Sequence, residues 1–222
     1  MSVISPSNQL VKTVQFGHGY GATGVAVSPS TGDIYVTNNP SDSVAVLDPF
    51  SNTVIDTIQL SSGTGPVAVA VDPGTGNVYV ANNGNGTVSV FNSSNSFIKT
   101  VNIGASTAPL SLAVSGDVYV ANSGNGTVSL TYPTNNTVVN TINVGGSPVG
   151  VAAGPTGVPG AGDIYVASDG AGSGGTVSVV NPAHTILETI NVGDLPSGVA
   201  VSPTGPQAGD IYVTNTGNGT CQ

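Results

Sequence analysis

The sequence predicts an all-β fold made from one unit that is repeated five times. The phrase GDIYVTN at residues 32–38 has four close relatives farther along the chain, and their tyrosines recur every 40 to 47 residues. Each period also holds four short Val- and Ile-rich runs, bounded by Gly, Pro, Asn and Ser, without helical periodicity. Four strands in about 40–45 residues make one propeller blade. We therefore expect a β-propeller of four-stranded antiparallel blades.

The four runs of each unit can be followed in order through the second repeat. They are AVAVDP at 68–73, GNVYVAN at 76–82, TVSVFN at 87–92 and FIKTVNI at 97–103. Each run is largely alternating and is separated from the next by turn residues, which is typical of strands joined by hairpins. A sheet of four short strands cannot cover both of its own faces. Radial stacking of such sheets covers each face with the next sheet.

Each end of the chain carries half a unit. MSVIS at 1–5 and LVKTVQF at 10–16 continue the third and fourth runs, whereas the last 28 residues supply a first and a second run. We therefore expect one domain over residues 1–222, with five blades and the last blade closed by strands from both termini. Such closure removes exposed sheet edges. A fragment of a larger propeller is the alternative. The expected parts are 1–17 for the outer two strands of the closing blade, 18–194 for four complete blades and 195–222 for its inner two strands.

The composition is poor in charge and argues against several classes of partner. Only 6% of residues are charged, Lys12 and Lys99 are the only basic side chains apart from histidine, and the net charge is −9. Nucleic acid and anionic membrane surfaces are therefore disfavoured, because both need a basic footprint. Cys221 is the single cysteine, so no intrachain disulfide forms. No apolar run is long enough to span a membrane, and the first ten residues do not resemble a signal peptide.

The repeated phrases resemble a known family. The segments GVAVSP, GDIYVTN, TVSVFN and NTVVNTINVG, in that order, resemble the YVTN family of β-propeller repeats found in bacterial and archaeal surface-layer-type and secreted proteins. The resemblance covers nearly the whole chain, although the familiar members have seven blades rather than five. It implies an extracellular or cell-envelope location and a scaffold or binding role. It implies no single activity, because propellers host many functions.

Two residue types of the phrase have expected structural roles. The tyrosine is the only large side chain present in every unit, so we expect it to fill the space between neighbouring blades. The trailing asparagine is expected to bond backbone groups at the end of the strand. The tyrosines are Tyr35, Tyr79, Tyr119, Tyr165 and Tyr212, and the asparagines are Asn38, Asn82, Asn122 and Asn215.

A ligand site, if the propeller has one, is expected at the central mouth. The strand order places the second-to-third and fourth-to-first connections on one face, and these connections are rich in Asn, Gly and Ser. The candidate binding side chains there are Tyr20, Asp42, Asp169 and Asp194. Amides, hydroxyls and carboxylates suit a neutral sugar or a weak cation. The alternative is turn chemistry, since Asn-Gly pairs favour tight hairpins.

The loops also hold Asn-X-Ser/Thr sequons, which are candidate glycosylation sites in a compartment that glycosylates. They are Asn85, Asn92, Asn125, Asn135 and Asn218. Repeated aspartates before the second strand follow Gly at a turn, so turn stabilisation is favoured over a calcium ring. We expect no metal and no cofactor.

The sequence favours a non-enzymatic protein. His18 and His184 fall on connections at opposite faces of the ring, so they cannot form one acid–base pair. The first hypothesis is an extracellular or cell-surface scaffold that binds other surface proteins or glycans. A structural variant is self-assembly, in which the terminal half-blades pair between molecules instead of within one. The second is a lectin-like propeller that binds carbohydrate through its polar loops. A propeller lyase is the third and least favoured.

Overall fold

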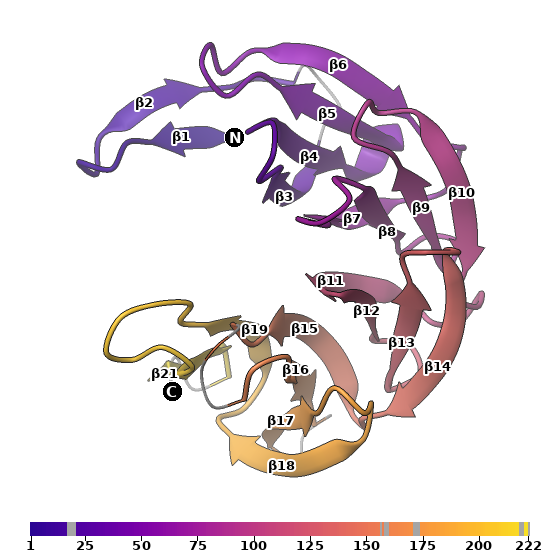
Figure 1. Ribbon diagram of the computed structural model, residues 1–222, viewed down its shortest axis with the longest axis vertical. Coiled ribbons are helices and arrows are strands. Elements are labelled where there is room, and N and C mark those ends of the chain that lie inside the picture. Colours follow the sequence, from indigo (N-terminus) through magenta and orange to yellow (C-terminus); the bar gives the residue numbers. More distant parts are fainter. Residues whose placement is uncertain (17–20, 156, 158–159, 171–173, 218–219, 222) are drawn as a thin grey trace.

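The computed structural model is an open arc of small antiparallel sheets (Figure 1). It describes residues 1–16, 21–155, 157, 160–170, 174–217 and 220–221. Within each four-stranded sheet the strands pair in chain order, from the inside of the arc to its outer rim (Figure 1). The expected β-propeller of four-stranded antiparallel blades is thus confirmed.

The strands fall into four ranks by their place in the blade. The first strands are β3 (Ala22–Val27), β7 (Pro66–Val71), β11 (Pro109–Ser115), β15 (Ser147–Ala153) and β19 (Pro196–Val201). The second strands are β4 (Ile34–Asn38), β8 (Val78–Asn82), β12 (Asp117–Asn122), β16 (Ile164–Asp169) and β20 (Ile211–Asn215). The third strands are β5 (Ser43–Leu47), β9 (Thr87–Phe91), β13 (Thr127–Tyr132), β17 (Gly175–Val180) and the short β21 (Thr220–Cys221). The fourth strands are β6 (Val54–Gln59), β10 (Phe97–Asn102), β14 (Thr137–Asn143) and β18 (Ile186–Val192). The N-terminal pair is β1 (Ser2–Ile4) and β2 (Leu10–Thr13).

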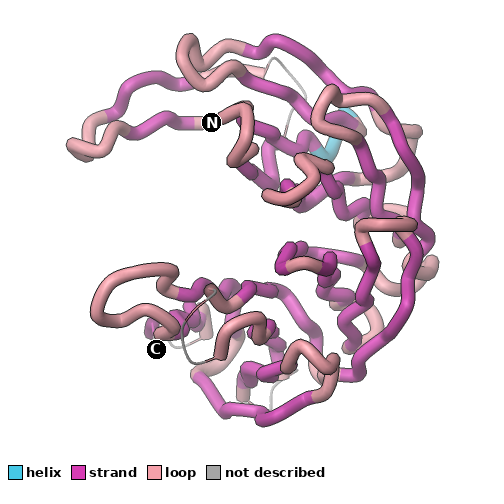
Figure 2. Tube along the Cα trace, viewed as in Figure 1, coloured by secondary structure: helices cyan, strands magenta, loops and turns pink. Residues whose placement is uncertain are grey.

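Short loops join these strands, as Figure 2 shows. One single-turn 3₁₀ helix, η1 (Asn39–Ser41), lies in the connection from β4 to β5 and carries Pro40 in its first turn. It is the helical segment in the part of the chain that is described (Figure 2). Every other connection there is a turn or an irregular loop, as the Gly- and Asn-rich spacers predict.

Burial follows the rank of the strand. Every residue of β8 and of β5 is buried, because neighbouring sheets cover both faces of a second or third strand. Fourth strands lie at the rim and bury at most one position, such as Ile58 in β6 and Val101 in β10, and β18 buries none. The near-continuous apolar runs of the inner strands thus match two-sided burial.

The repeated tyrosine fills the space between blades, as expected. Tyr35 is 2% exposed and belongs to one apolar cluster with Val78 and Val80 of the next blade. Its hydroxyl donates to Oδ1 of Asn95, which also belongs to the next blade, at 2.9 Å. Burial raises the pKa of this phenol. Tyr79, Tyr119 and Tyr165 are buried to a similar degree at the following interfaces.

Each rim strand carries a bulge near its start. In β10 the pairing with β9 skips Ile98, between the pairs Phe97–Phe91 and Lys99–Val90. The rim strands β6, β14 and β18 show the same register shift near their start. A bulge of this kind adds one residue to one strand and increases the local twist.

The N-terminal pair is built as the outer half of a blade. Ser2 pairs with Thr13, Val3 with Lys12 and Ile4 with Leu10, and the same residue position is skipped as in β10. The apolar side of this pair packs on the first blade, where Val14 joins a cluster with Val36 and Leu47.

The closing blade expected from both termini is not formed. β1 and β2 make a separate two-stranded sheet, whereas β19, β20 and β21 make a three-stranded sheet on the opposite side of the gap (Figure 1). The expected ring, with residues 1–17 closing on 195–222, is therefore open. The two half-blades also overlap by one position in register. Cys221 pairs with Thr214, at the position that Val88 holds in the second blade, and Met1 bonds to Val14 as Val88 pairs with Val101.

The open end leaves the last repeated tyrosine without a neighbour. Tyr212 of β20 is 46% exposed, because no further blade covers the face that receives its ring. The same residue in the same phrase is therefore core in four blades and surface in the fifth.

This difference gives a matched pair of substitutions. Tyr79→Ala should lower the free energy of unfolding by about 3–5 kcal/mol, since it empties a buried interface. Tyr212→Ala should lower it by less than about 1 kcal/mol. Urea denaturation of both variants measures the two losses. Equal losses would contradict the open arrangement of the arc.

Candidate functional site

The connections from second to third strands and from fourth to first strands lie together and are hydrogen-bonded to one another. We call the face that they form the loop face. In the second blade, the backbone N–H groups of Ile103 and Gly104 donate to the carbonyl oxygen of Gly86 at 3.0 and 3.1 Å. Across the first and second blades, the N–H of Gly84 donates to the carbonyl oxygen of Thr64 at 2.9 Å. The backbone groups of these loops are thus partly satisfied by other loops.

The Asn-Gly sequences of these loops serve turn geometry. Gly86 has a φ of +66°, in the left-handed region, and a Cβ added there would overlap the carbonyl oxygen of Gly104. Only glycine meets both requirements without strain. The turn interpretation of this loop is therefore supported by its geometry.

Buried asparagine side chains at the end of a second strand hold the third strand of the same blade in place. Asn82 is fully buried, and its Nδ2 donates to the hydroxyls of Thr87 at 2.9 Å and Ser89 at 2.8 Å. Asn122 makes the equivalent bonds in the third blade. The expectation that these asparagines bond backbone groups is therefore wrong for both. Their partners are side-chain hydroxyls, which the alternating Thr-Val-Ser pattern of the third strand supplies.

Asp42 is a loop-fixing residue on the first blade. Its carboxylate accepts bonds from the N–H groups of Gly63 and Gly65, both at 2.7 Å, and from the hydroxyl of Thr64 at 2.9 Å. The bond from Gly65 is the main cause that holds the pKa of Asp42 below its ordinary value of 3.8. The candidate ligand residue therefore organises the connection from β6 to β7.

The lowered pKa predicts a dependence of stability on acid. The contribution of Asp42 is present above the ordinary carboxyl pKa and is lost as the pH falls through the lower folded value. Asp42→Asn should cost about 1 kcal/mol at neutral pH. The variant should then lose less stability than the parent chain between about pH 5 and about pH 2.

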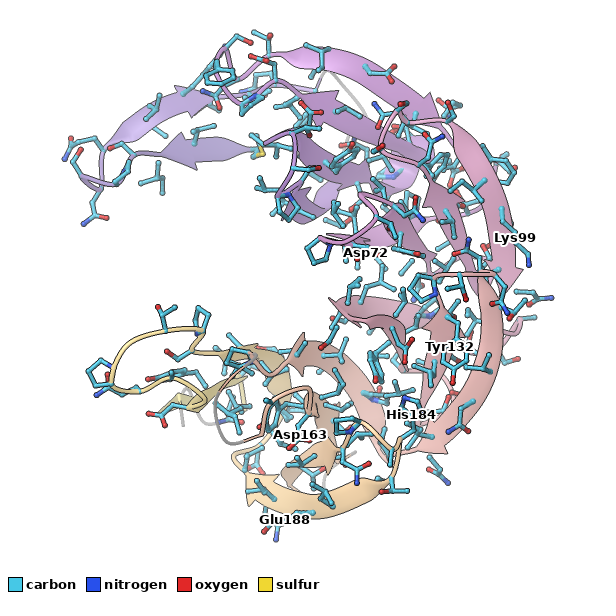
Figure 3. All side chains as sticks on the ribbon, viewed as in Figure 1. Asp72, Lys99, Tyr132, Asp163, His184 and Glu188 are labelled. Atoms are coloured by element: carbon cyan, nitrogen blue, oxygen red, sulfur yellow. The ribbon has the colours of Figure 1, made fainter. Side chains whose placement is uncertain are left out.

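Thermal unfolding across this pH range checks the prediction. Glu188→Gln removes the same charge from the exposed rim strand β18, where Figure 3 labels Glu188, and serves as the control. Parallel acid profiles for Asp42→Asn and the parent would show that the carboxylate does not stabilise the loop.

Two other candidates come together. Asp169 is the last residue of β16, Asp194 precedes β19, and both line one hollow of about 290 Å³ with Leu195. The hollow lies where the loops of the fourth blade meet those of the three-stranded sheet. Asp42 belongs to the first blade and does not line it. Tyr20 lies outside the described residues, so the four expected side chains are not seen to converge.

The sequon asparagines are engaged in their own turns. Oδ1 of Asn85, Asn125 and Asn135 each accepts a bond of 2.7 Å from the hydroxyl of the threonine two residues later. These three asparagines are exposed, and Asn92 is half-buried. Asn218 lies outside the described residues. Glycosylation of the five stays a prediction.

His184 belongs to a contact between blades on the opposite face. It occupies the turn from β17 to β18 (Figure 3). Its Nε2 lies 3.5 Å from the carboxylate of Asp117, and its ring is tilted against Tyr119. Burial and the charge of Asp117 raise the pKa of Tyr119 to about 12. His18 lies outside the described residues, so its expected separation from His184 stays a prediction.

Two further features are not found within the described residues. Within them, no three His, Cys, Asp or Glu side chains gather closely enough to hold a metal ion. None of the helical structure in those ranges is long and apolar enough to cross a membrane.

Comparisons with known proteins agree with the architecture. A family model described as NHL repeat matches residues 64–91, a span that includes β7, β8 and β9. No curated protein matches the chain. Among solved structures, a streptogramin B lyase matches with 14% identity and a TM-score of 0.79, over 96% of this chain and 68% of that chain.

Two further structures are similar over most of the chain. The virginiamycin B lyase of Staphylococcus aureus has 10% identity and a TM-score of 0.77, over all of this chain and 75% of the lyase. Hydrazine synthase of Kuenenia stuttgartiensis has 19% identity and a TM-score of 0.74, over 95% of this chain and 68% of that chain. At such identities the likeness concerns the fold. The chain is a β-propeller repeat protein.

Proposed function

We propose that this chain is a non-enzymatic propeller of the YVTN type. In this proposal it acts outside the cell or in the cell envelope as a structural repeat or protein-interaction scaffold. The supporting observation is how the polar groups of the loop face are used. The carboxylate of Asp42, the amide of Asn82 and the carbonyl of Gly86 all bond within the blades and their loops. Side chains committed to holding loops are typical of a scaffold.

The amino-acid composition supports an extracellular location. A chain with 6% charged residues and a net charge of −9 has few ion pairs to lose when the pH or the salt changes. Its polar surface consists of Asn, Thr, Ser and Gly, whose hydrogen bonds do not depend on ionisation near neutral pH.

Brief protease treatment of intact source cells tests the location. The chain should be cleaved on intact cells or recovered from the medium, while a cytoplasmic marker protein stays whole. Recovery of the uncut chain only after lysis would overturn the extracellular assignment. Conversion of a streptogramin B by the purified chain, followed by liquid chromatography, would overturn the non-enzymatic assignment and favour a lyase.

Self-association through the terminal half-blades belongs to the same proposal. Asn215 is 3% exposed, and neither its Nδ2 nor its Oδ1 has a hydrogen-bond partner. Ser2 stands at the strand position that Ser89 holds in the second blade, where it receives the amide of Asn82. A β1–β2 pair from a second copy therefore carries a matching hydroxyl for Asn215, beside the part of β20 that the short β21 leaves unpaired.

Sedimentation over a wide range of concentrations tests this association. We expect the mean mass to rise with concentration, because each copy has two different edges that can pair with other copies. One edge is the β1–β2 pair, and the other is the β20 side of the three-stranded sheet. Ser2→Pro should weaken the rise, since proline cannot donate to a strand ladder. A constant monomer mass at every concentration would overturn self-association and leave the other parts of the proposal standing.

A further inference from the structure

A polar slot lies between the outer halves of the first and second blades, away from the hollow that holds Asp169 and Asp194. Its volume is about 310 Å³, and all the side chains that line it are uncharged. Gln59 contributes from the first blade, and Ser89, Phe91, Phe97 and Thr100 contribute from the second. This volume is at the lower end of the range of about 300–1,000 Å³ that is usual for ligand pockets.

The aromatic wall of the slot departs from the repeat. Phe97 pairs with Phe91 across β10 and β9, with ring centroids 5.8 Å apart in an edge-to-face arrangement. Phe91 is 4% exposed, whereas Phe97 is 62% exposed. The residues at the position of Phe97 in the other rim strands are aliphatic, namely Leu10, Val54, Val138 and Ile186. The buried ring of Phe91 thus packs against the exposed ring of Phe97, at a position where the other rim strands carry an aliphatic residue.

The polar groups of the slot are held in place and keep free bonding capacity. Ser89 is 5% exposed, and its hydroxyl oxygen accepts the bond from Asn82, so its own proton remains to be donated. Nε2 of Gln59 donates to the carbonyls of Ser41 and Asp42 at 3.0 and 2.9 Å, which leaves Oε1 as an acceptor. The hydroxyl of Thr100 can act in either way.

This combination of groups favours one class of ligand. An ion would meet no opposite charge in the slot, and the net charge of −9 disfavours anions further. A purely apolar ligand would leave the hydroxyls of Ser89 and Thr100 without partners, which is costly. A sugar has apolar C–H faces that pack on an aromatic ring and hydroxyls that both donate and accept. Fixed neutral polar groups beside an exposed ring match both features.

We propose that the slot binds a neutral saccharide of one or two rings, with one sugar ring packed on Phe97 and its hydroxyls bonded to Ser89, Thr100 and Gln59. This site lies between two blades and not at the central mouth. The proposal is independent of the scaffold role, so its failure would leave the location and the assembly of the chain unaffected.

A titration followed by ¹H–¹⁵N correlation spectra tests the proposal on the full chain. The probes are methyl β-glucoside, methyl α-mannoside, cellobiose and lactose, each added to about 50 mM, because small ligands bind weakly. At least one probe should shift the amide signals of residues 59–61 and 85–100 in a saturable way. The absence of saturable shifts with all four, or shifts gathered around Asp169 and Asp194, would overturn the proposal.

Three variants make the test specific. Phe97→Val installs the residue that the third blade carries at this position, Val138, and should weaken binding about tenfold. Ser89→Ala installs the residue of the first blade, Ala45, and should weaken binding about fivefold. Phe50→Val is the matched control, because Phe50 is 92% exposed in the turn from β5 to β6 and does not line the slot.

The outcomes separate the site from a general effect on folding. Each variant should keep the unperturbed spectrum of the other blades, which confirms that it is folded. Unchanged binding by folded Phe97→Val, or equal weakening by Phe50→Val, would overturn the assignment of the ring. Weakening by Phe97→Val and Ser89→Ala with Phe50→Val unchanged would support it.

Discussion

The contact between one blade and the next is the interaction on which the rest of the structure depends. Successive residues of a strand point to opposite faces of its sheet. In β8, Val78 and Val80 face the preceding blade and contact Tyr35, while Tyr79 between them faces the following blade. One five-residue strand therefore supplies one half of each of two interfaces. This explains why the phrase combines one large ring with small β-branched neighbours, and why its strands are buried on both faces.

Hydrogen bonds to side chains, rather than ion pairs, are the second organising element. Asn82 joins the end of one strand to two hydroxyls of the next, and Asp42 closes a loop through backbone N–H groups. Such bonds are directional and place each hydroxyl in a fixed orientation. Where Ala45 replaces the serine in the first blade, the amide of Asn38 has no partner. The same bonds that stabilise a blade thus also define the polar groups that line the slot between blades.

The architecture could be predicted from the sequence because the sequence is periodic. The strands, their order in each blade and the role of the tyrosine all follow from a pattern that repeats, and the structure bears them out. Features that lie outside the repeat could not be predicted from it. The repeat pattern predicts each half-blade at the termini but not that they form two separate sheets, β1–β2 and β19–β20–β21. Of the four side chains expected at the central mouth, Asp169 and Asp194 line one hollow, whereas Asp42 fixes its own loop. The sequence does not predict the slot, because Phe97 occupies an ordinary apolar position of a strand and its exposure depends on the packing of the blades.

The bulges of the rim strands have a consequence for contacts between molecules. An arc of blades presents a row of outermost strands with unpaired backbone groups, and several of these strands also expose adjacent apolar side chains such as Val54 and Ile55. A flat edge of that kind is a template on which a strand of another molecule can pair. The extra residue in each rim strand interrupts the regular spacing of donors and acceptors and turns the edge out of plane. The rim is thereby protected against sheet extension by its geometry, in a chain in which only 6% of the residues are charged.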